Sequence, residues 1–138
     1  MSGGFNALTF TRVLNAGDAD TFLTQLRSFF AAIPYDLYFA KGESYYQTIF
    51  YVVFTLLGRF VGSEVRTASG RVDAVVKTRE AVYIFEFKLD SAGTAEDALR
   101  QIEEKGYHVP YEADSRRVVK VGVVFDTEKR TLGDWLVC

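Results

Sequence analysis

The fold of this chain is decided by residues 81–89, which read AVYIFEFKL and are apolar except at two charged positions. Those positions are Glu86 and Lys88, two residues apart. Successive side chains of a strand point to opposite faces, so a strand here places both charges on one face and most of the aromatic rings on the other. Charges at the edge of a core are costly unless they are paired or bound to a metal. The stretch therefore predicts a buried strand whose two charged side chains need a partner or a bound metal.

The preceding residues predict two more strands and a further carboxylate near this pair. Residues 71–77 alternate in the manner of a strand and contain Asp73, and a turn at 78–80 joins them to the strand above. Short links and alternation favour an antiparallel meander of strands at 63–67, 71–77 and 81–89. Asp73 and Glu86 then lie within reach of each other if they share a face of the sheet.

Helices and two further strands complete the predicted order, after a loop or frayed start over residues 1–17. Asp18 or Asp20 can cap the first helix, and Thr94 caps the last one, which ends at Gly106. A strand, a helix and another buried strand indicate a parallel crossover. The helices are expected at 18–32, 43–57 and 94–105, and the last two strands at 118–125 and, at an edge of the sheet, 131–137.

Length and composition indicate one globular α/β domain. The chain has 138 residues, which is enough for a single domain with a core of its own. We expect residues 1–41 to be an N-terminal helical extension packed on a core formed by residues 42–138. The longest apolar run, residues 49–57, is far shorter than the roughly 20 residues needed to span a membrane, so no membrane association is expected.

Charge and cysteine usage limit the function classes. The formal net charge of −2 gives no overall electrostatic reason to expect nucleic acid, so local basic residues or a metal must provide for a polyanion. The single cysteine, Cys138, cannot form an internal disulfide, which fits a reducing cytoplasm. The single histidine, His108, excludes a metal site with several histidine ligands.

Asp73, followed on the next strand by Glu86-Phe87-Lys88, resembles the PD-(D/E)XK nuclease superfamily. In that superfamily an acid on one strand precedes an acid and a lysine two positions apart on the next. Glu43 at the start of a core helix and Gln101 on the following helix are similar to further features of the family. The resemblance implies a restriction-endonuclease-like core of helix, three-stranded antiparallel meander, helix and strand, with a mixed central sheet flanked by helices.

Residues 70–125 look like the branch of this superfamily found at the C-terminal end of predicted bacterial and archaeal AAA-type ATPases. The motifs for that branch are GRVD, FEFK, QIEEKGY and VGVVF. The chain contains no Gly-rich phosphate-binding loop, so the resemblance implies a C-terminal domain separated from an ATPase domain of a longer parent protein. Two positions depart from the family: Val72 replaces the proline of the motif, and Lys105 stands where related nucleases have a tyrosine.

The resemblance implies a metal-dependent nuclease that hydrolyses phosphodiester bonds, with DNA as the expected substrate. Two carboxylates on adjacent strands suit a hard cation such as Mg²⁺, for which Mn²⁺ is a substitute. Lys88 is then the catalytic ammonium beside the metal. The metal ligands implied are Asp73, Glu86, Glu43 and the main-chain carbonyl of Phe87, and the substrate contacts are Gln101, Lys105 and Arg71.

Two other interpretations remain open from the sequence. The same fold can serve as a non-catalytic interaction, nucleic-acid-binding or oligomerisation module attached to an ATPase, which the negative net charge favours. Glu86 and Lys88 can also form a buried structural ion pair without a metal. The strand at 131–137 is a candidate edge for pairing between two copies of the chain. A cluster formed by Arg116, Arg117 and Lys120 fits a solvated strand entrance better than a DNA-binding patch.

Overall fold

Five strands form one mixed sheet in the computed structural model, which describes residues 12–32, 64–67 and 73–138. The strands are hydrogen-bonded in chain order, with an antiparallel meander of three followed by a parallel and then an antiparallel neighbour. This arrangement confirms the predicted meander, crossover and edge strand. The strands are β1 (Glu64–Thr67), β2 (Asp73–Lys77), β3 (Ala81–Leu89), β4 (Arg117–Asp126) and β5 (Thr131–Val137).

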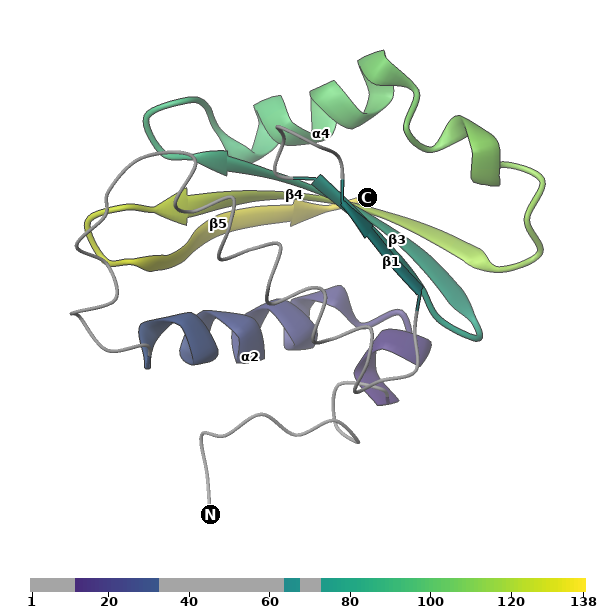
Figure 1. Ribbon diagram of the computed structural model, residues 1–138, viewed down its shortest axis with the longest axis horizontal. Coiled ribbons are helices and arrows are strands. Elements are labelled where there is room, and N and C mark those ends of the chain that lie inside the picture. The colour runs from purple at the N-terminus through teal and green to yellow at the C-terminus, as the bar shows by residue number, and fades with distance from the viewer. Residues whose placement is uncertain (1–11, 33–63, 68–72) are drawn as a thin grey trace.

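In the described part of the chain, α2 (Ala19–Ala31) covers one face of the sheet and α4 (Ala95–Lys105) covers the other (Figure 1). The predicted central helix at 43–57, with Glu43, lies outside the described residues, as does Arg71. The division into an extension and a core at residue 41 falls there too and stays a prediction. No helix in the described part has the length and apolar character needed to cross a membrane.

Aromatic packing against α2 builds the larger core layer. Asp18 caps this helix by accepting a hydrogen bond from the Thr21 N–H at 3.1 Å, as one of the two predicted caps. Phe22 and Phe30 are fully buried, and their rings lie 5.9 Å from Phe85 on β3 and 5.6 Å from Phe125 on β4. The N-terminal helix therefore shares one core with the sheet.

The boundaries of α4 follow local signals. Thr94 and Asp97 form a capping box at its start, and Gly106 ends it with a φ of 68°, which glycine adopts without strain. An ion pair between Glu103 and Lys120 joins the last turns of the helix to β4. The capping box and Gly106 thus fix the bounds of α4, and the ion pair holds its C-terminal part over the sheet.

Two segments differ from the predictions. Residues 12–15 are helical rather than loop, and Leu14 in this turn is fully buried. The hydroxyl of Tyr83 on β3 donates to the Leu14 carbonyl at 2.5 Å, which explains why this turn is ordered against the sheet. A short 3₁₀ helix, η2 (Val109–Tyr111), interrupts the connection from α4 to β4.

Candidate functional site

The alternation along β3 places its two charges on the α4 face of the sheet. Tyr83, Phe85 and Phe87 belong to the core cluster that packs on α2, and their rings stack in sequence with centroids 5.9 Å apart. The intervening positions therefore face α4. Glu86 and Lys88 share that face, as the sequence predicts.

Glu86 is a buried carboxylate, with only 4% of its surface exposed. Its partner in the parallel ladder is Gly122 on β4. A Cβ atom on Gly122 would lie 2.5 Å from the Ala95 carbonyl and 2.8 Å from the Leu99 N–H nitrogen. The backbone of α4 thus contacts β4 immediately beside Glu86, and this close approach helps to exclude water from the carboxylate.

Position 73 lies directly opposite Glu86 in the β2–β3 ladder. Hydrogen bonding on the two sides of β3 shows which kind of pair this is. Thr78 N–H donates to the Ala81 carbonyl across the hairpin, whereas the Asp90 N–H donates to Phe125 on β4. Odd positions of β3 therefore bond to β2 and even positions to β4. Asp73 and Glu86 form a non-hydrogen-bonded pair, the class in which Cα atoms approach to about 4.5 Å.

The same alternation orients the main chain of Phe87. As an odd position of β3, Phe87 turns its carbonyl toward β2, on the side where that strand begins at Asp73. Its side chain points into the α2 layer and is buried. The predicted carbonyl ligand thus lies on the same side of β3 as position 73. Main-chain and carboxylate oxygens are the donors that Mg²⁺ prefers.

Lys88 is half-buried and its stem runs beside the loop that leads into α4. A Cβ atom on Gly93 would lie 3.0 Å from Lys88 Cδ and 3.0 Å from Asp97 Oδ2. Within residues 12–32, 64–67 and 73–138, Lys88 has no carboxylate at ion-pair distance. The structural ion pair with Glu86 considered from the sequence is therefore not observed.

One flank of α4 extends from the site along the helix. Asp97, Gln101 and Lys105 follow each other at four-residue steps, which places them on the same side of a helix. The flank begins beside Lys88, because Asp97 and Lys88 both approach Gly93. Gln101 Oε1 is buried and accepts no hydrogen bond from the described residues. Lys105 is exposed, about 12 Å further along the helix than Asp97.

The basic residues at the start of β4 are engaged within the protein. Arg116 binds Asp114 through two nitrogens at 2.7 and 2.9 Å and donates to the Thr78 carbonyl at 3.1 Å. Arg117 donates to the Ala16 carbonyl at 2.8 Å, and Lys120 pairs with Glu103. These contacts favour the structural interpretation of the three residues over a DNA-binding patch.

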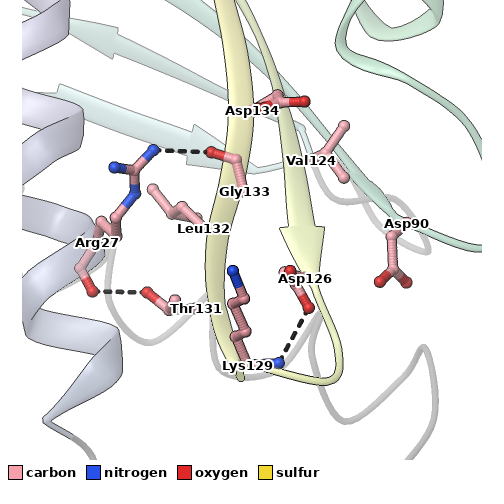
Figure 2. A pocket seen from close by; sticks show the side chains of 9 residues that line it. All are labelled: Arg27, Asp90, Val124, Asp126, Lys129, Thr131, Leu132, Gly133 and Asp134. Atoms are coloured by element: carbon pink, nitrogen blue, oxygen red, sulfur yellow. Dashed lines mark hydrogen bonds between the residues drawn. The ribbon is translucent and has the colours of Figure 1, made fainter.

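A pocket of about 440 Å³ opens at the end of the sheet where β4 turns into β5 (Figure 2). Asp90 and Asp126 line it, but the turn engages both carboxylates. Asp126 Oδ1 accepts hydrogen bonds from the N–H groups of Glu128 and Lys129 at 3.0 and 2.9 Å. The Asp90 carboxylate accepts hydrogen bonds from the N–H and the hydroxyl of Thr127. None of the site residues predicted from the sequence lines this pocket.

The described residues hold only part of the predicted ligand set. Glu86 and the Phe87 main chain lie in β3, the backbone of Asp73 lies opposite, and Glu43 lies outside the described residues. No group of three or more His, Cys, Asp or Glu side chains that could hold a metal occurs among the residues that the structure describes. Gly93 and Gly122 were not expected at the site, although a glycine inside a strand signals close approach of another backbone.

Comparison with known proteins gives two matches. A family model described as the PD-(D/E)XK nuclease superfamily matches residues 41–135. An uncharacterized protein in the vnfD 5' region of Azotobacter chroococcum mcd 1 is 36% identical over 129 residues. The match covers 91% of this chain and 25% of that protein, so the chain spans about a quarter of its relative's length. No solved structure matches the chain.

Proposed function

Because the chain belongs to the PD-(D/E)XK nuclease superfamily and has its restriction-endonuclease-like fold, we propose that it is a metal-dependent nuclease acting on DNA. The observation that supports this best is the pairing of positions 73 and 86. A buried glutamate stands directly across from an aspartate in the closer class of antiparallel pair. Two like charges at such positions disfavour each other, and a divalent cation removes that penalty.

The residues around this pair fit a hard divalent cation. Asp73, Glu86, Glu43 and the Phe87 carbonyl would hold Mg²⁺, or Mn²⁺ in its place, through oxygen ligands. When bound, such a cation makes coordinated water more acidic and neutralises charge on a phosphoryl group. The fit rests on the burial of Glu86 and on the side of β3 to which the Phe87 carbonyl turns.

The remaining residues act on the substrate. Lys88 presents an ammonium on the same face as Glu86, where it can orient the attacking water and stabilise charge on the phosphate. Gln101 lies on the flank of α4 that begins beside Lys88 and can hold the substrate backbone. Lys105, further along that flank, and Arg71 would contact phosphates away from the reacting bond.

Cleavage assays on supercoiled plasmid, linear duplex and single strands test this function. Replacing Lys88 with alanine should lower Mg²⁺-dependent cleavage by about 10²–10⁴-fold, the usual contribution of a positioned acid–base group. Asp73→Ala should remove cleavage and Mg²⁺ binding together. Lys129→Ala is the matched control, because Lys129 is an exposed lysine in the β4–β5 turn. Equal cleavage by the wild type and Lys88→Ala would refute the proposal.

A non-catalytic nucleic-acid-binding or interaction module is the second candidate. The net charge of −2 and the internal contacts of Arg116, Arg117 and Lys120 favour the interaction module among these. It differs from the nuclease in one measurable respect, because it requires no metal. Titration calorimetry showing no saturable Mg²⁺ or Mn²⁺ binding would favour the module over the nuclease.

The proposed setting of the domain is a longer parent protein in the cytoplasm. The chain spans about a quarter of its relative, which supports an additional partner domain, and an ATPase domain is the partner that the sequence motifs suggest. Leu136 and Val137 are exposed on β5, an edge of the sheet, which supports this strand as a pairing site for a second copy. Size measurement of the purified domain would test that pairing.

A further inference from the structure

The stem of Lys88 lies close to Gly93 in the loop before α4, and Asp97 in the first turn of that helix lies close to the same glycine. The position of a Cβ atom on Gly93 is 3.0 Å from Lys88 Cδ, 3.0 Å from Asp97 Oδ2 and 3.4 Å from Asp97 Cβ. Contacts of 3.0 Å are tighter than ordinary van der Waals packing between carbon atoms. A methyl group at residue 93 would therefore require the Lys88 stem and the Asp97 side chain to shift by a few tenths of an ångström.

Hydrogen bonds hold the turn after β3, next to Gly93, in place. Ala92 N–H donates to the Leu89 carbonyl at 2.8 Å and closes the turn after β3. Asp90 accepts the Thr127 N–H at 3.2 Å and the Thr127 hydroxyl at 3.0 Å, which joins the turn to the β4–β5 connection. Because these hydrogen bonds hold the turn, a steric contact at residue 93 is not easily relieved by movement of the loop.

Asp97 also lies close to Gly93, and its carboxylate does not pair with the Lys88 ammonium. Asp97 Oδ2 accepts a hydrogen bond from the Thr94 N–H at 2.9 Å, and Asp97 Oδ1 accepts one from the Arg100 guanidinium at 2.8 Å. Hydrogen bonds from Thr94, followed by the one from Arg100, lower the pKa of Asp97. The Asp97 carboxylate is therefore held in place by the helix cap and by Arg100, close to the glycine that the Lys88 stem approaches.

We propose that Gly93 is a positioning residue for Lys88, and that the loop and the capping box of α4 together hold the lysine stem so that its ammonium reaches the reacting phosphate. This inference rests on the proposed function for the role of the ammonium. The steric contact itself is independent of that function. It couples the start of α4 to the catalytic strand through the side chain of Lys88.

A stability cycle tests the contact without any assay of activity. Gly93→Ala should lower the melting temperature of the otherwise wild-type protein, because the new methyl group meets the stem. In a Lys88→Ala background the stem is gone and only the contact with Asp97 remains, so the same change should lower the melting temperature less. In a Lys88→Met background a stem of similar width remains, and the loss should return. Equal shifts in the three backgrounds would overturn the inference.

Cleavage kinetics test the consequence for the site. Gly93→Ala should lower kcat by roughly tenfold, since a misplacement of about 1 Å can cost about 100-fold and the expected shift of the stem is smaller. KM and the affinity for Mg²⁺ should stay unchanged, because Gly93 contacts neither ligand. Gly133→Ala is the control, since a Cβ there meets only ordinary contacts at 3.5 and 3.6 Å. Equal kcat for the two variants, with cleavage intact in the wild type, would overturn the inference and leave the proposed function standing.

Discussion

Glu86 of β3 and Gly122 of β4 are direct partners in the parallel ladder, and α4 lies against the sheet at Gly122. A glycine at this point lets the helix backbone reach the strand, and the buried carboxylate stands immediately beside the contact. The depth at which α4 packs thus affects both the stability of the domain and the environment of Glu86.

Replacing Gly122 with alanine should destabilise the protein by about 1–3 kcal/mol, the usual cost of overpacking a tight site. The added methyl group would lie 2.5 Å from the Ala95 carbonyl, so α4 or β4 must move. Urea denaturation measures the change in the free energy of unfolding. Gly133→Ala, at a site with room for a methyl group, should change it far less. Similar losses in both variants would contradict the close approach of α4.

Replacing Glu86 with glutamine should separate stability from metal binding. The change removes one of two negative charges at cross-strand positions and with it a carboxylate ligand of the proposed cation. Mg²⁺ at about 100 times its dissociation constant should stabilise the wild type by about 2.7 kcal/mol and leave the variant unchanged. Thermal unfolding with EDTA or Mg²⁺ tests this. Stabilisation of the variant by Mg²⁺ would show that Glu86 is not a ligand.

A third prediction concerns the acid stability of the connection between α4 and β4. Hydrogen bonds from Arg116 hold the pKa of Asp114 at about 2. Because the pKa of Asp114 is lower in the folded state, its ionisation stabilises the fold at pH values above the ordinary aspartate pKa of about 4. This stabilisation is lost as the pH falls toward 2. Asp114→Asn should therefore be less stable than the wild type at pH 7, and the difference should shrink between pH 4 and 2.

Urea denaturation of both proteins across this pH range measures the difference. Asp134→Asn is a matched control, because Asp134 is an exposed aspartate of β5. A difference between wild type and Asp114→Asn that stays constant from pH 7 to pH 2 would show that the ion pair with Arg116 does not contribute.

Local signals explain how much of the fold could be predicted. Alternation within residues 81–89 gives β3 and the face on which Glu86 and Lys88 lie, and Thr94 and Gly106 mark the ends of α4. Each of these signals acts within a few residues of the chain. The order of the strands follows from the short links between them and from one helical crossover.

Features that depend on distant contacts could not be predicted in this way. The helical turn at Leu14 is held by Tyr83, 69 positions along the chain, and η2 carries no periodic pattern of its own. The close approach at Gly122 and the space beside Gly93 depend on how α4 packs. The candidate site residues come from a family motif, whereas the glycines that lie beside Glu86 and Lys88 are seen only in the structure.

The contact between Tyr83 and Leu14 gives the last prediction. Tyr83→Phe removes the hydrogen bond from the Tyr83 hydroxyl to the Leu14 carbonyl, which keeps the Gly17 N–H at 3.2 Å as its other donor. The change should therefore cost about 1 kcal/mol, the usual net contribution of one hydrogen bond. Urea denaturation at pH 8 measures the loss. Tyr111→Phe is the control, since the Tyr111 hydroxyl makes no hydrogen bond to other described residues and its ring stays against Lys77.

The same variant also tests the alkaline limit of the domain. Burial raises the pKa of Tyr83 to about 12, against the ordinary value of 10.0. A raised pKa stabilises the folded state below pH 10, and this contribution is lost as the pH rises toward 12. The stability difference between wild type and Tyr83→Phe should therefore narrow from pH 10 upward. A difference that is unchanged at pH 11 would mean that the phenol ionises alike in the folded and unfolded chains, and that burial against the Leu14 turn does not control it.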